Sequence, residues 1–418
     1  MDSGGGTPAV GNRMRTLVIA GEYPWPENSG SRIRLMNTLL GLSGLGPVEL
    51  FSIVPSARQD FAPPSPPSIV AKVGRVGYHD TGSGSGAMAA MLRPWLPFSL
   101  STRDGPKVRA TLDEFVTGRY DLVWYVGVRS WLLAGERSPA PAVLDLDDLE
   151  DQKIVARLSV PGRSRSAGLG HLKRLAARAY SEEEARRWRR LQRRAGRRVR
   201  SVVVCSRLDA ERATDGGVPR VAVVPNGYQG VEEPPGSGGI GKPPVLLFQG
   251  TLRYPPNAQA ARYLVDEIGP AVRALVPDAR IRLVGRATPA LAPLDDPPRV
   301  TMVGLVPDIG AELRSADLVV VPIRFGSGTR VKIIEAFAHR IPVVSTSLGA
   351  EGLEARDGEH LLIGDDPESF ASACARLLGD EALRARIVDA AHALFLDRYE
   401  RGRAEEAVRD VARQVTES

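Results

Sequence analysis

The sequence predicts an α/β protein built from two doubly wound, parallel-sheet domains. Continuous Val/Ile/Leu runs recur along the chain, and segments with helical spacing of apolar residues separate them. Runs without polar alternation indicate strands buried on both faces, the pattern of a parallel sheet covered by helices. This alternation is interrupted at residues 230–244 and then restarts. The chain of 418 residues is also too long for one ordinary core.

The first series of strands and helices fills the N-terminal half. A helix is predicted over 31–42 and a long polar helix over 170–198. Residues 62–100 are rich in Pro, Gly and Ser and predict a long loop with little regular structure. The predicted strands of this half are residues 16–20, 48–54, 121–127, 141–147, 201–206 and 221–227.

The second series follows a stretch rich in glycine and proline, which predicts a flexible linker. Its predicted strands are 245–250, 281–285, 300–304, 317–322 and 342–346, and its predicted helices are 256–275, 308–314 and 328–339. The sequence therefore predicts the following division: a disordered leader (1–13), an N-terminal domain (14–229), a linker (230–244), a C-terminal domain (245–395) and a final helix (396–418), which we place against the N-terminal domain.

Composition limits the possible classes of protein. The apolar share is 43% and the charged share 25%, as in soluble globular proteins, and no run of about 18 apolar residues occurs. The N-terminus lacks the pattern of a signal peptide, and two cysteines in apolar surroundings favour a reducing cytoplasm. No Cys/His cluster has metal-ligand spacing, so we expect no structural zinc. We also predict no cofactor.

The net charge of +6 is unevenly distributed, because residues 186–200 hold nine arginines. The first interpretation is a solvated helix face balanced by the acidic "SEEEA" before it. The second is a peripheral contact with an anionic membrane, as for a lipid-linked acceptor. Nucleic acid is not expected, because only Trp188 offers a stacking ring within the run.

The stretch "PIRFGSGTRVKIIEAFAHRIPVVSTSLGAEGL" (322–353) carries the most specific signal. A buried strand runs into Gly-Ser-Gly, and a helix is expected to begin near Gly328 or Thr329. Free amides and the positive end of the helix dipole at such a start bind phosphate. Glu335 lies one turn beyond Lys332 on the same face and could accept hydrogen bonds from the vicinal hydroxyls of a ribose. The alternative is a solvated Lys–Glu pair of little energetic weight.

This stretch resembles the donor-site signature of family 4 (group 1) glycosyltransferases, which have the GT-B fold. The order and spacing of several further segments also resemble the family: "GTLRYPPNAQAARYLVDEIGPAVRALVPDARIRLVG", "VTMVGLVPDIGAELRSADLVVVP" and "DGEHLLIGDDPESFA", and more loosely "EYPWPENSGSRIR", "LDLDDLEDQ" and "VVPNG". The resemblance implies transfer of a sugar from a nucleoside-diphosphate sugar to a hydroxyl acceptor, with retention of configuration and without a metal.

The resemblance also implies that residues 14–229 form the acceptor-side domain and residues 245–395 the nucleotide-sugar donor domain, and it implies roles for individual residues. Glu335 matches the second Glu of the family's Glu-x7-Glu motif and would hold the ribose, whereas the first Glu is replaced by Ser327. Arg253 and Lys332 would neutralise the diphosphate. The implied donor-binding residues are Gly250, Gly326, Ser327, Gly328, Thr329, Arg330, Glu335, Gly349, Ala350 and Glu351.

The N-terminal half offers residues for the acceptor side. Gly30 matches the family glycine that allows close approach to donor or acceptor, and we place Ser31 and Arg32 beside it; an ordinary βα loop is the alternative. In "LDLDDLED" the acids Asp145, Asp147 and Asp148 could bind acceptor hydroxyls or a cation, or cap the next helix. We assign Asp147 to the cleft and Asp148 to the catalytic set with Arg253 and Lys332.

Two other functions stay open from sequence: a sugar-nucleotide epimerase of the same fold, and a non-catalytic binding protein that has kept the fold. The sequence does not give the base or sugar of the donor, the oligomeric state, or the acceptor, which could be a glycan, a lipid-linked sugar or a small metabolite.

Overall fold

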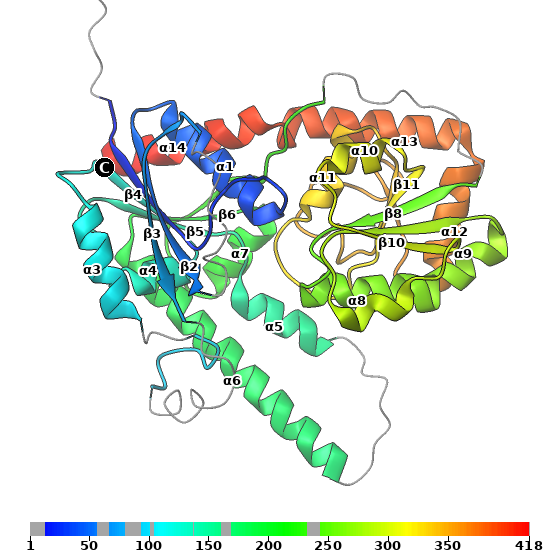
Figure 1. The fold of residues 1–418 in the computed structure, drawn as a ribbon, viewed down its shortest axis with the longest axis horizontal. Helices are drawn as coiled ribbons and strands as arrows, with labels where there is room; N and C mark the ends of the chain where they lie inside the picture. The colour runs from blue at the N-terminus through cyan, green and yellow to red at the C-terminus, as the bar shows by residue number, and fades with distance from the viewer. Residues whose placement is uncertain are drawn as a thin grey trace, which may run out of the picture.

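The computed structural model describes residues 13–56, 67–79, 93–100, 104–136, 138–159, 169–231 and 243–417. Within these residues two parallel sheets form two domains, and helices cover the sheet faces (Figure 1). The predicted fold class is therefore confirmed. The predicted leader, apart from Arg13, and most of the predicted linker lie outside the described residues.

The N-terminal sheet has the order β3-β2-β1-β4-β5-β6-β7, in which every described pairing is parallel. Its strands are β1 (Thr16–Ala20), β2 (Val48–Pro55), β3 (Val70–Tyr78), β4 (Leu122–Val126), β5 (Ala142–Leu146), β6 (Ser201–Val204) and β7 (Val221–Val223). Its helices are α1 (Gly30–Ser43), α3 (Gly105–Phe115), α4 (Val128–Leu133), α5 (Glu150–Ser159), α6 (Leu169–Arg198) and α7 (Arg207–Asp215).

The prediction of a long loop over 62–100 was wrong for β3, which pairs with β2 along its whole length. As an edge strand, β3 is only partly buried and carries Lys72, Gly74 and Arg75, so it lacks the continuous apolar run of the inner strands. Gly74 is required because a Cβ there would clash with the ring of Phe115. Residues 57–66 and 80–92 of this region lie outside the described residues.

The C-terminal sheet has the order β10-β9-β8-β11-β12-β13 and is also parallel. Its strands are β8 (Val245–Gln249), β9 (Arg280–Val284), β10 (Val300–Gly304), β11 (Leu318–Val321), β12 (Val343–Ser345) and β13 (Leu362–Ile363). Its helical segments are α8 (Pro255–Tyr263), η2 (Leu264–Ile268), α9 (Gly269–Leu275), η3 (Pro289–Leu294), α10 (Ile309–Arg314), α11 (Val331–Ala338), α12 (Pro367–Gly379), α13 (Glu381–Leu394) and η4 (Phe395–Tyr399).

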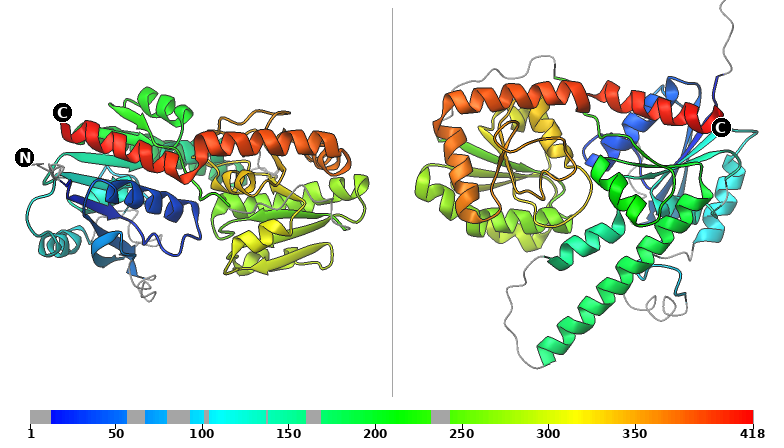
Figure 2. Two further views of the ribbon diagram at one scale, coloured as in Figure 1. Left: turned by 90° about the horizontal axis from the view of Figure 1, so that it is seen from above. Right: turned by 180° about the vertical axis from the view of Figure 1, so that it is seen from behind.

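The last helix, α14 (Arg401–Glu417), crosses back to the N-terminal domain, as the sequence predicted (Figures 1 and 2). It packs on α1, where Val408 meets Gly41: a Cβ at Gly41 would lie 2.9 Å from the backbone oxygen of Glu405 and from Val408 Cβ. The crossing is anchored where the amide of Tyr228 donates to the Tyr399 oxygen over 2.9 Å, and that of Arg401 to the Tyr228 oxygen over 2.9 Å. The two domains are therefore joined by α14 as well as by the linker.

A buried ion pair fixes α1 against the N-terminal sheet. The guanidinium of Arg34 donates to both carboxylate oxygens of Asp145, at the end of β5, and to the Val224 oxygen and Asn226 Oδ1 beyond β7. Arg34 and Asp145 are 2% and 0% exposed. Such a pair is tolerated inside a protein only when the donors and the charge are satisfied together.

The long helix α6 projects away from the body of the molecule (Figure 1). Among the described residues, no helix is long and apolar enough to cross a membrane.

Our first prediction concerns the buried pair. Arg34→Leu leaves the Asp145 carboxylate buried and unpaired, so the free energy of unfolding should fall by about 3–5 kcal/mol. All five tryptophans belong to the N-terminal domain, so urea unfolding followed by tryptophan fluorescence measures this domain. The Arg34→Leu/Asp145→Leu double variant should lose less than Arg34→Leu alone. Equal losses would show that the unpaired charge is not the cause.

Our second prediction concerns the contact between α1 and α14. Gly41→Val should push α14 away from α1, because the close approach leaves no room for a side chain. The C-terminal helix should then be removed by limited proteolysis sooner than in the wild type. Gly379→Ala, at the end of α12 where a Cβ meets nothing within 4 Å, is the matched control. An unchanged cleavage rate for Gly41→Val would contradict the packing.

Candidate functional site

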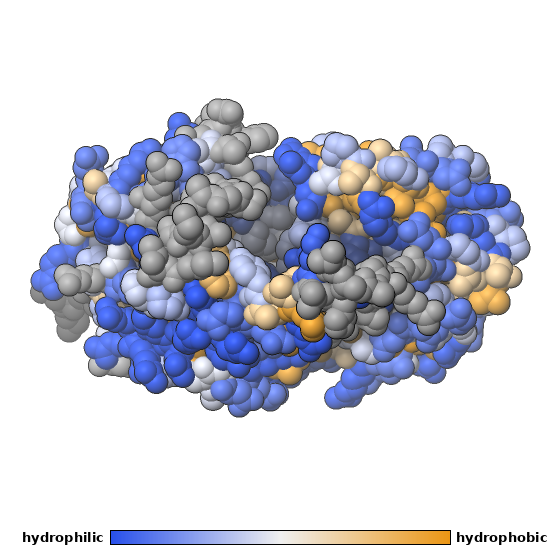
Figure 3. Space-filling model, turned by 90° about the horizontal axis from the view of Figure 1, so that it is seen from below, coloured by the Kyte–Doolittle hydropathy of each residue, from blue (hydrophilic) through white to orange (hydrophobic). Residues whose placement is uncertain are grey.

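The candidate site lies at the carboxyl ends of the strands of both sheets, where the strand order changes direction. In the C-terminal sheet this point lies between β8 and β11. Ligands of doubly wound sheets bind in the crevice at such switch points. The loop 250–254 follows β8 and the loop 322–330 follows β11. Figure 3 shows a hollow between the two halves of the molecule.

The glycine-rich loop after β11 needs two of its glycines for backbone conformation. Gly326 has φ 134° and Gly328 has φ 75°, which disfavour other residues. The guanidinium of Arg330 closes the loop by donating to the backbone oxygens of Ser327 and Gly328. The helix α11 begins at Val331, two or three residues later than the predicted start near Gly328 or Thr329, because Arg330 is still extended (φ −87°, ψ 94°) and forms its N-cap.

The N-terminal domain holds this loop from the opposite side. Ser327 Oγ donates to Asp148 Oδ1 over 3.4 Å and to the Leu149 oxygen over 3.2 Å. The side-chain amide of Asn226 donates to Thr329 Oγ1 over 2.7 Å. The amide of Thr329, predicted to face a phosphate, donates instead to the Cys205 thiol over 3.4 Å. The loop is therefore a contact between the domains.

Lys332 lies on the first turn of α11 and is half-buried. Its amine donates to Asn257 Oδ1 over 3.0 Å and lies 4.2 Å from the centre of the Phe248 ring. Burial, helped by the nearby charge of Arg330, lowers the pKa of Lys332 to about 7, although Glu335 opposes the shift. A Cβ on Gly250 would lie 3.1 Å from this amine, so the loop after β8 passes close to it.

Glu335 faces the same region from the next turn of α11. Burial raises its pKa, against a side-chain hydrogen bond from Gln249 and the charge of Lys332. Gln249 Nε2 donates to Glu335 Oε2 over 3.4 Å, and Gln249 is only 3% exposed. Among the described residues, Gln249 Oε1 has no hydrogen-bond partner. The helix thus carries the Lys332 amine, which gains or loses a proton near pH 7. One turn further on it carries the Glu335 carboxylate, whose oxygens can accept further hydrogen bonds.

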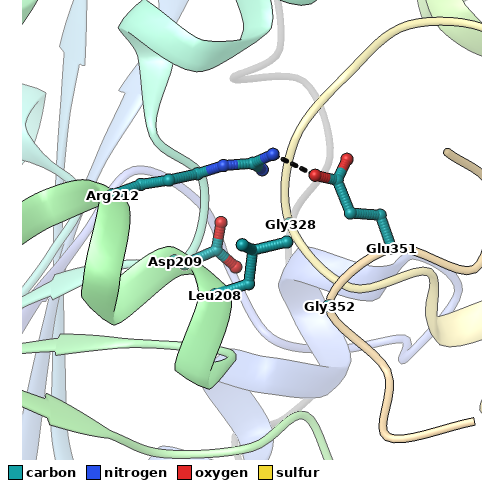
Figure 4. Close-up of a pocket in the computed structure, with 6 residues that line it drawn as sticks. All are labelled: Leu208, Asp209, Arg212, Gly328, Glu351 and Gly352. Atoms are coloured by element: carbon teal, nitrogen blue, oxygen red, sulfur yellow. Dashed lines mark hydrogen bonds and ion pairs between the residues drawn. The ribbon is translucent and has the colours of Figure 1, made fainter.

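The loop 348–352 contributes a second contact between the domains. The Gly349 amide donates to Thr346 Oγ1 over 2.9 Å, and the Ala350 amide to the Thr346 oxygen over 3.0 Å. The carboxylate of Glu351 pairs with Arg212 of α7. Figure 4 shows this pair beside a small pocket that has no room for a water molecule. The pocket is lined by Leu208, Asp209, Arg212, Gly328, Glu351 and Gly352.

The predicted acceptor-side residues Gly30, Ser31 and Arg32 make different contacts in the structure. Gly30 starts α1 and faces α11, since a Cβ on it would lie 3.2 Å from Val331 Cγ2. Ser31 Oγ lies 3.4 Å from Ser29 Oγ. Arg32 is turned toward its own loop, where it pairs with Glu22 over 3.1 Å.

Asp147 and Asp148 lie at the domain boundary. Burial and the adjacent Asp148 raise the pKa of Asp147 to about 7, although Arg34 opposes the shift. Asp148 Oδ2 pairs with Lys153 of α5 over 2.7 Å. Arg253 is exposed in the loop after β8.

Sequence reasoning missed several residues that build the site. They are Lys153, Cys205, Asn226 and Gln249, together with the ion pair of Arg34. Asn226 belongs to "VVPNG" and Gln249 directly precedes Gly250, so position beside a motif was the available signal. Nothing in the local sequence joins Cys205 to Thr329, because that contact spans the two domains.

The comparisons with known proteins concern the C-terminal domain first. Residues 243–380 match the family model described as glycosyl transferases group 1. The chain is 32% identical over 165 residues to a phosphatidyl-myo-inositol mannosyltransferase of Mycobacterium leprae, covering 37% of this chain and 42% of that protein. It is 27% identical over 135 residues to an uncharacterized 44.6 kDa protein in the cps region of Klebsiella pneumoniae, covering 30% and 35%. Each match thus spans less than half of the curated relative.

Solved structures resemble the whole chain. Anabaena HepE in complex with UDP and glucose has a TM-score of 0.60 and 15% identity, covering 96% of this chain and 99% of that one. Sucrose-phosphate synthase of Thermosynechococcus elongatus has a TM-score of 0.66 and 15% identity, with the same coverage. At this identity the likeness concerns the fold. Residues 243–380 are therefore similar in sequence to the group 1 glycosyl transferases, and the two domains of the chain have the GT-B fold.

Proposed function

We propose that this protein transfers a sugar from a nucleoside-diphosphate sugar to a hydroxyl acceptor, with retention of configuration. The observation that carries the proposal is that Lys332 and Glu335 lie one turn apart on the same face of α11, at the switch point between β8 and β11. An amine of lowered pKa can take up a proton as an anion binds, and a carboxylate one turn away suits a ribose. Anabaena HepE has been solved with UDP-glucose, which makes UDP the first nucleotide to test.

The proposed donor site keeps the residues assigned from sequence. Lys332 and the exposed Arg253 face the diphosphate, Glu335 binds the ribose, and the backbone around Gly250, Gly326–Thr329 and Gly349–Glu351 surrounds the phosphates and the sugar. Because Arg330 and Glu351 are engaged by Ser327, Gly328 and Arg212, we assign them to holding the loops. Gly30, Ser31, Arg32 and Asp147 stay on the acceptor side of the proposal, with Asp148 between the domains.

The proposed chemistry needs no group beyond donor, acceptor and protein. The bond from the anomeric carbon to the phosphate oxygen breaks, and a bond to the acceptor oxygen forms on the same face of the sugar. The proton of the acceptor hydroxyl passes to the departing phosphate oxygen. Stabilisation of the charge on that leaving group by the cations of the site is the main catalytic contribution. Contact between the domains excludes water, which would otherwise hydrolyse the donor.

The acceptor stays a prediction among glycans, lipid-linked sugars and small metabolites. The predicted membrane contact through residues 186–200 also stays a prediction. Five arginines of this run pair with carboxylates, namely Arg186, Arg187, Arg189, Arg190 and Arg194. This pairing favours the interpretation of a balanced helix face for that part of the run. The cytoplasm stays the proposed compartment, supported by the buried free thiols of Cys205 and Cys374.

The proposal is tested by thermal unfolding with a panel of nucleoside diphosphates. A nucleotide that binds the folded state raises the melting temperature, and Glu335→Ala should abolish the rise because the ribose loses its acceptor. Glu359→Ala, an exposed carboxylate of the same domain, is the control and should behave like the wild type. A rise that survives Glu335→Ala would overturn the ribose assignment, and no rise with any nucleotide would favour a non-catalytic protein. Turnover of a nucleotide sugar without acceptor would favour the epimerase.

A further prediction follows from Lys332. Its pKa of about 7 in the free protein means that the amine is largely neutral above pH 7, whereas a bound diphosphate favours the protonated form. Binding then takes up a proton, so UDP affinity should fall by about tenfold per pH unit above pH 7.5. Calorimetric titration between pH 7.5 and 9 measures this slope.

Lys332→Arg is the control for the pH dependence, because a guanidinium stays charged throughout this range. It should flatten the profile while keeping a positive charge at the site. A flat profile in the wild type would show that the Lys332 amine does not face the diphosphate.

A further inference from the structure

The N-terminal domain brings a cation of its own to the donor side of the cleft. Helix α5 follows β5 of the N-terminal domain, and in Figure 1 it points toward α8 of the C-terminal domain. Lys153 on this helix interacts electrostatically with Tyr254, the N-cap of α8. Its amine therefore lies near the loop that follows β8, in the other domain.

The partner of Lys153 is a carboxylate that also touches the glycine-rich loop. Asp148 Oδ2 lies 2.7 Å from the Lys153 amine, which also contacts Glu150 Oε1 over 3.2 Å. Asp148 Oδ1 accepts from Ser327 Oγ, and a Cβ on Gly328 would clash with it. Asp148 thus lies between a cation of one domain and the glycine-rich loop of the other. Its side chain is 30% exposed and that of Lys153 is 22% exposed, so solvent reaches the pair.

A further basic side chain, Arg330, belongs to the same region. Tyr254 interacts electrostatically with Asp148, with Lys153 and with Arg330, and Arg330 in turn repels the Lys332 amine. Three basic side chains thus lie around the loops that follow β8 and β11: Arg330 and the partly protonated Lys332 from the C-terminal domain, and Lys153 from α5. A diphosphate offers more charge and more acceptor oxygens than one carboxylate, so it can displace Asp148 from Lys153.

We propose that Lys153 is a diphosphate-binding residue supplied by the N-terminal domain, and that Asp148 holds it until the donor arrives. The inference rests on the proposed function, because it assigns a further residue to the same donor site. On donor binding the Lys153 amine exchanges the Asp148 carboxylate for a phosphate oxygen. The donor then bridges a lysine of each domain, so donor binding and contact between the domains support each other.

The test compares the binding of UDP and UMP by calorimetric titration, at fixed pH and salt. Lys153→Met should weaken UDP binding by at least about tenfold, the loss of one charge-assisted contact, and change UMP binding by less than about twofold. Lys153→Arg should restore most of the UDP affinity. Arg157→Met, which removes an exposed cation one turn further along α5, is the matched control and should bind both nucleotides like the wild type.

A second variant tests the part assigned to Asp148. Asp148→Asn keeps the size of the side chain but removes the competing charge, so UDP should bind at least about threefold more tightly, and UMP as before. Circular dichroism and tryptophan fluorescence show whether each variant is folded. A structural role of Lys153 would weaken UDP and UMP equally and would not be rescued by arginine.

Each outcome separates this inference from the proposed function. If the wild type binds UDP, Glu335→Ala abolishes binding and Lys153→Met binds like Arg157→Met, the inference is wrong and the donor site stands. Equal loss of UDP and UMP in Lys153→Met overturns it as well, and so does weaker UDP binding by Asp148→Asn. If the wild type binds no nucleoside diphosphate of the panel, both the donor site and the role of Lys153 are wrong.

Discussion

The buried ion pair between Arg34 and Asp145 is the interaction on which the rest of the architecture depends. It joins α1 to the end of β5, and the same guanidinium reaches the Val224 oxygen and Asn226 Oδ1 beyond β7. Asn226 then donates to Thr329 of the other domain. One desolvated charge pair therefore fixes the helix on which α14 packs and the loop that contacts the glycine-rich segment. Removing either partner would leave a buried charge without compensation.

The glycine-rich loop belongs structurally to both domains. Its backbone conformation comes from Gly326 and Gly328, but its contacts come from Asp148, Cys205 and Asn226 of the N-terminal domain. A change in the angle between the domains must therefore alter the environment of this loop. This coupling is the kind of contact through which closure of two domains can complete a site between them.

Within the part of the chain that the structure describes, positive charge around α11 and the glycine-rich loop is not matched by free negative charge. The burial that lowers the pKa of Lys332 and raises that of Glu335 disfavours the charged form of each group. Arg330 adds positive charge, and the nearby anion Asp148 is already paired with Lys153. An arrangement of this kind favours an anion that brings its own charge into the cleft, and perturbed groups in such a cleft are typical of functional sites.

The sequence by itself determined the two parallel-sheet domains, the position of almost every inner strand and the place of the glycine-rich loop after β11. Those features follow from local signals: apolar runs, glycines that permit unusual backbone angles, and the spacing of Lys332 and Glu335. The edge strand β3 was not predicted, because it is partly exposed and its sequence has no continuous apolar run. Tertiary structure alone decided that the Thr329 amide binds the Cys205 thiol, that Glu351 pairs with Arg212 and that Lys153 faces the other domain. These contacts join residues more than 100 positions apart, and the packing of two separately folded domains brings them together.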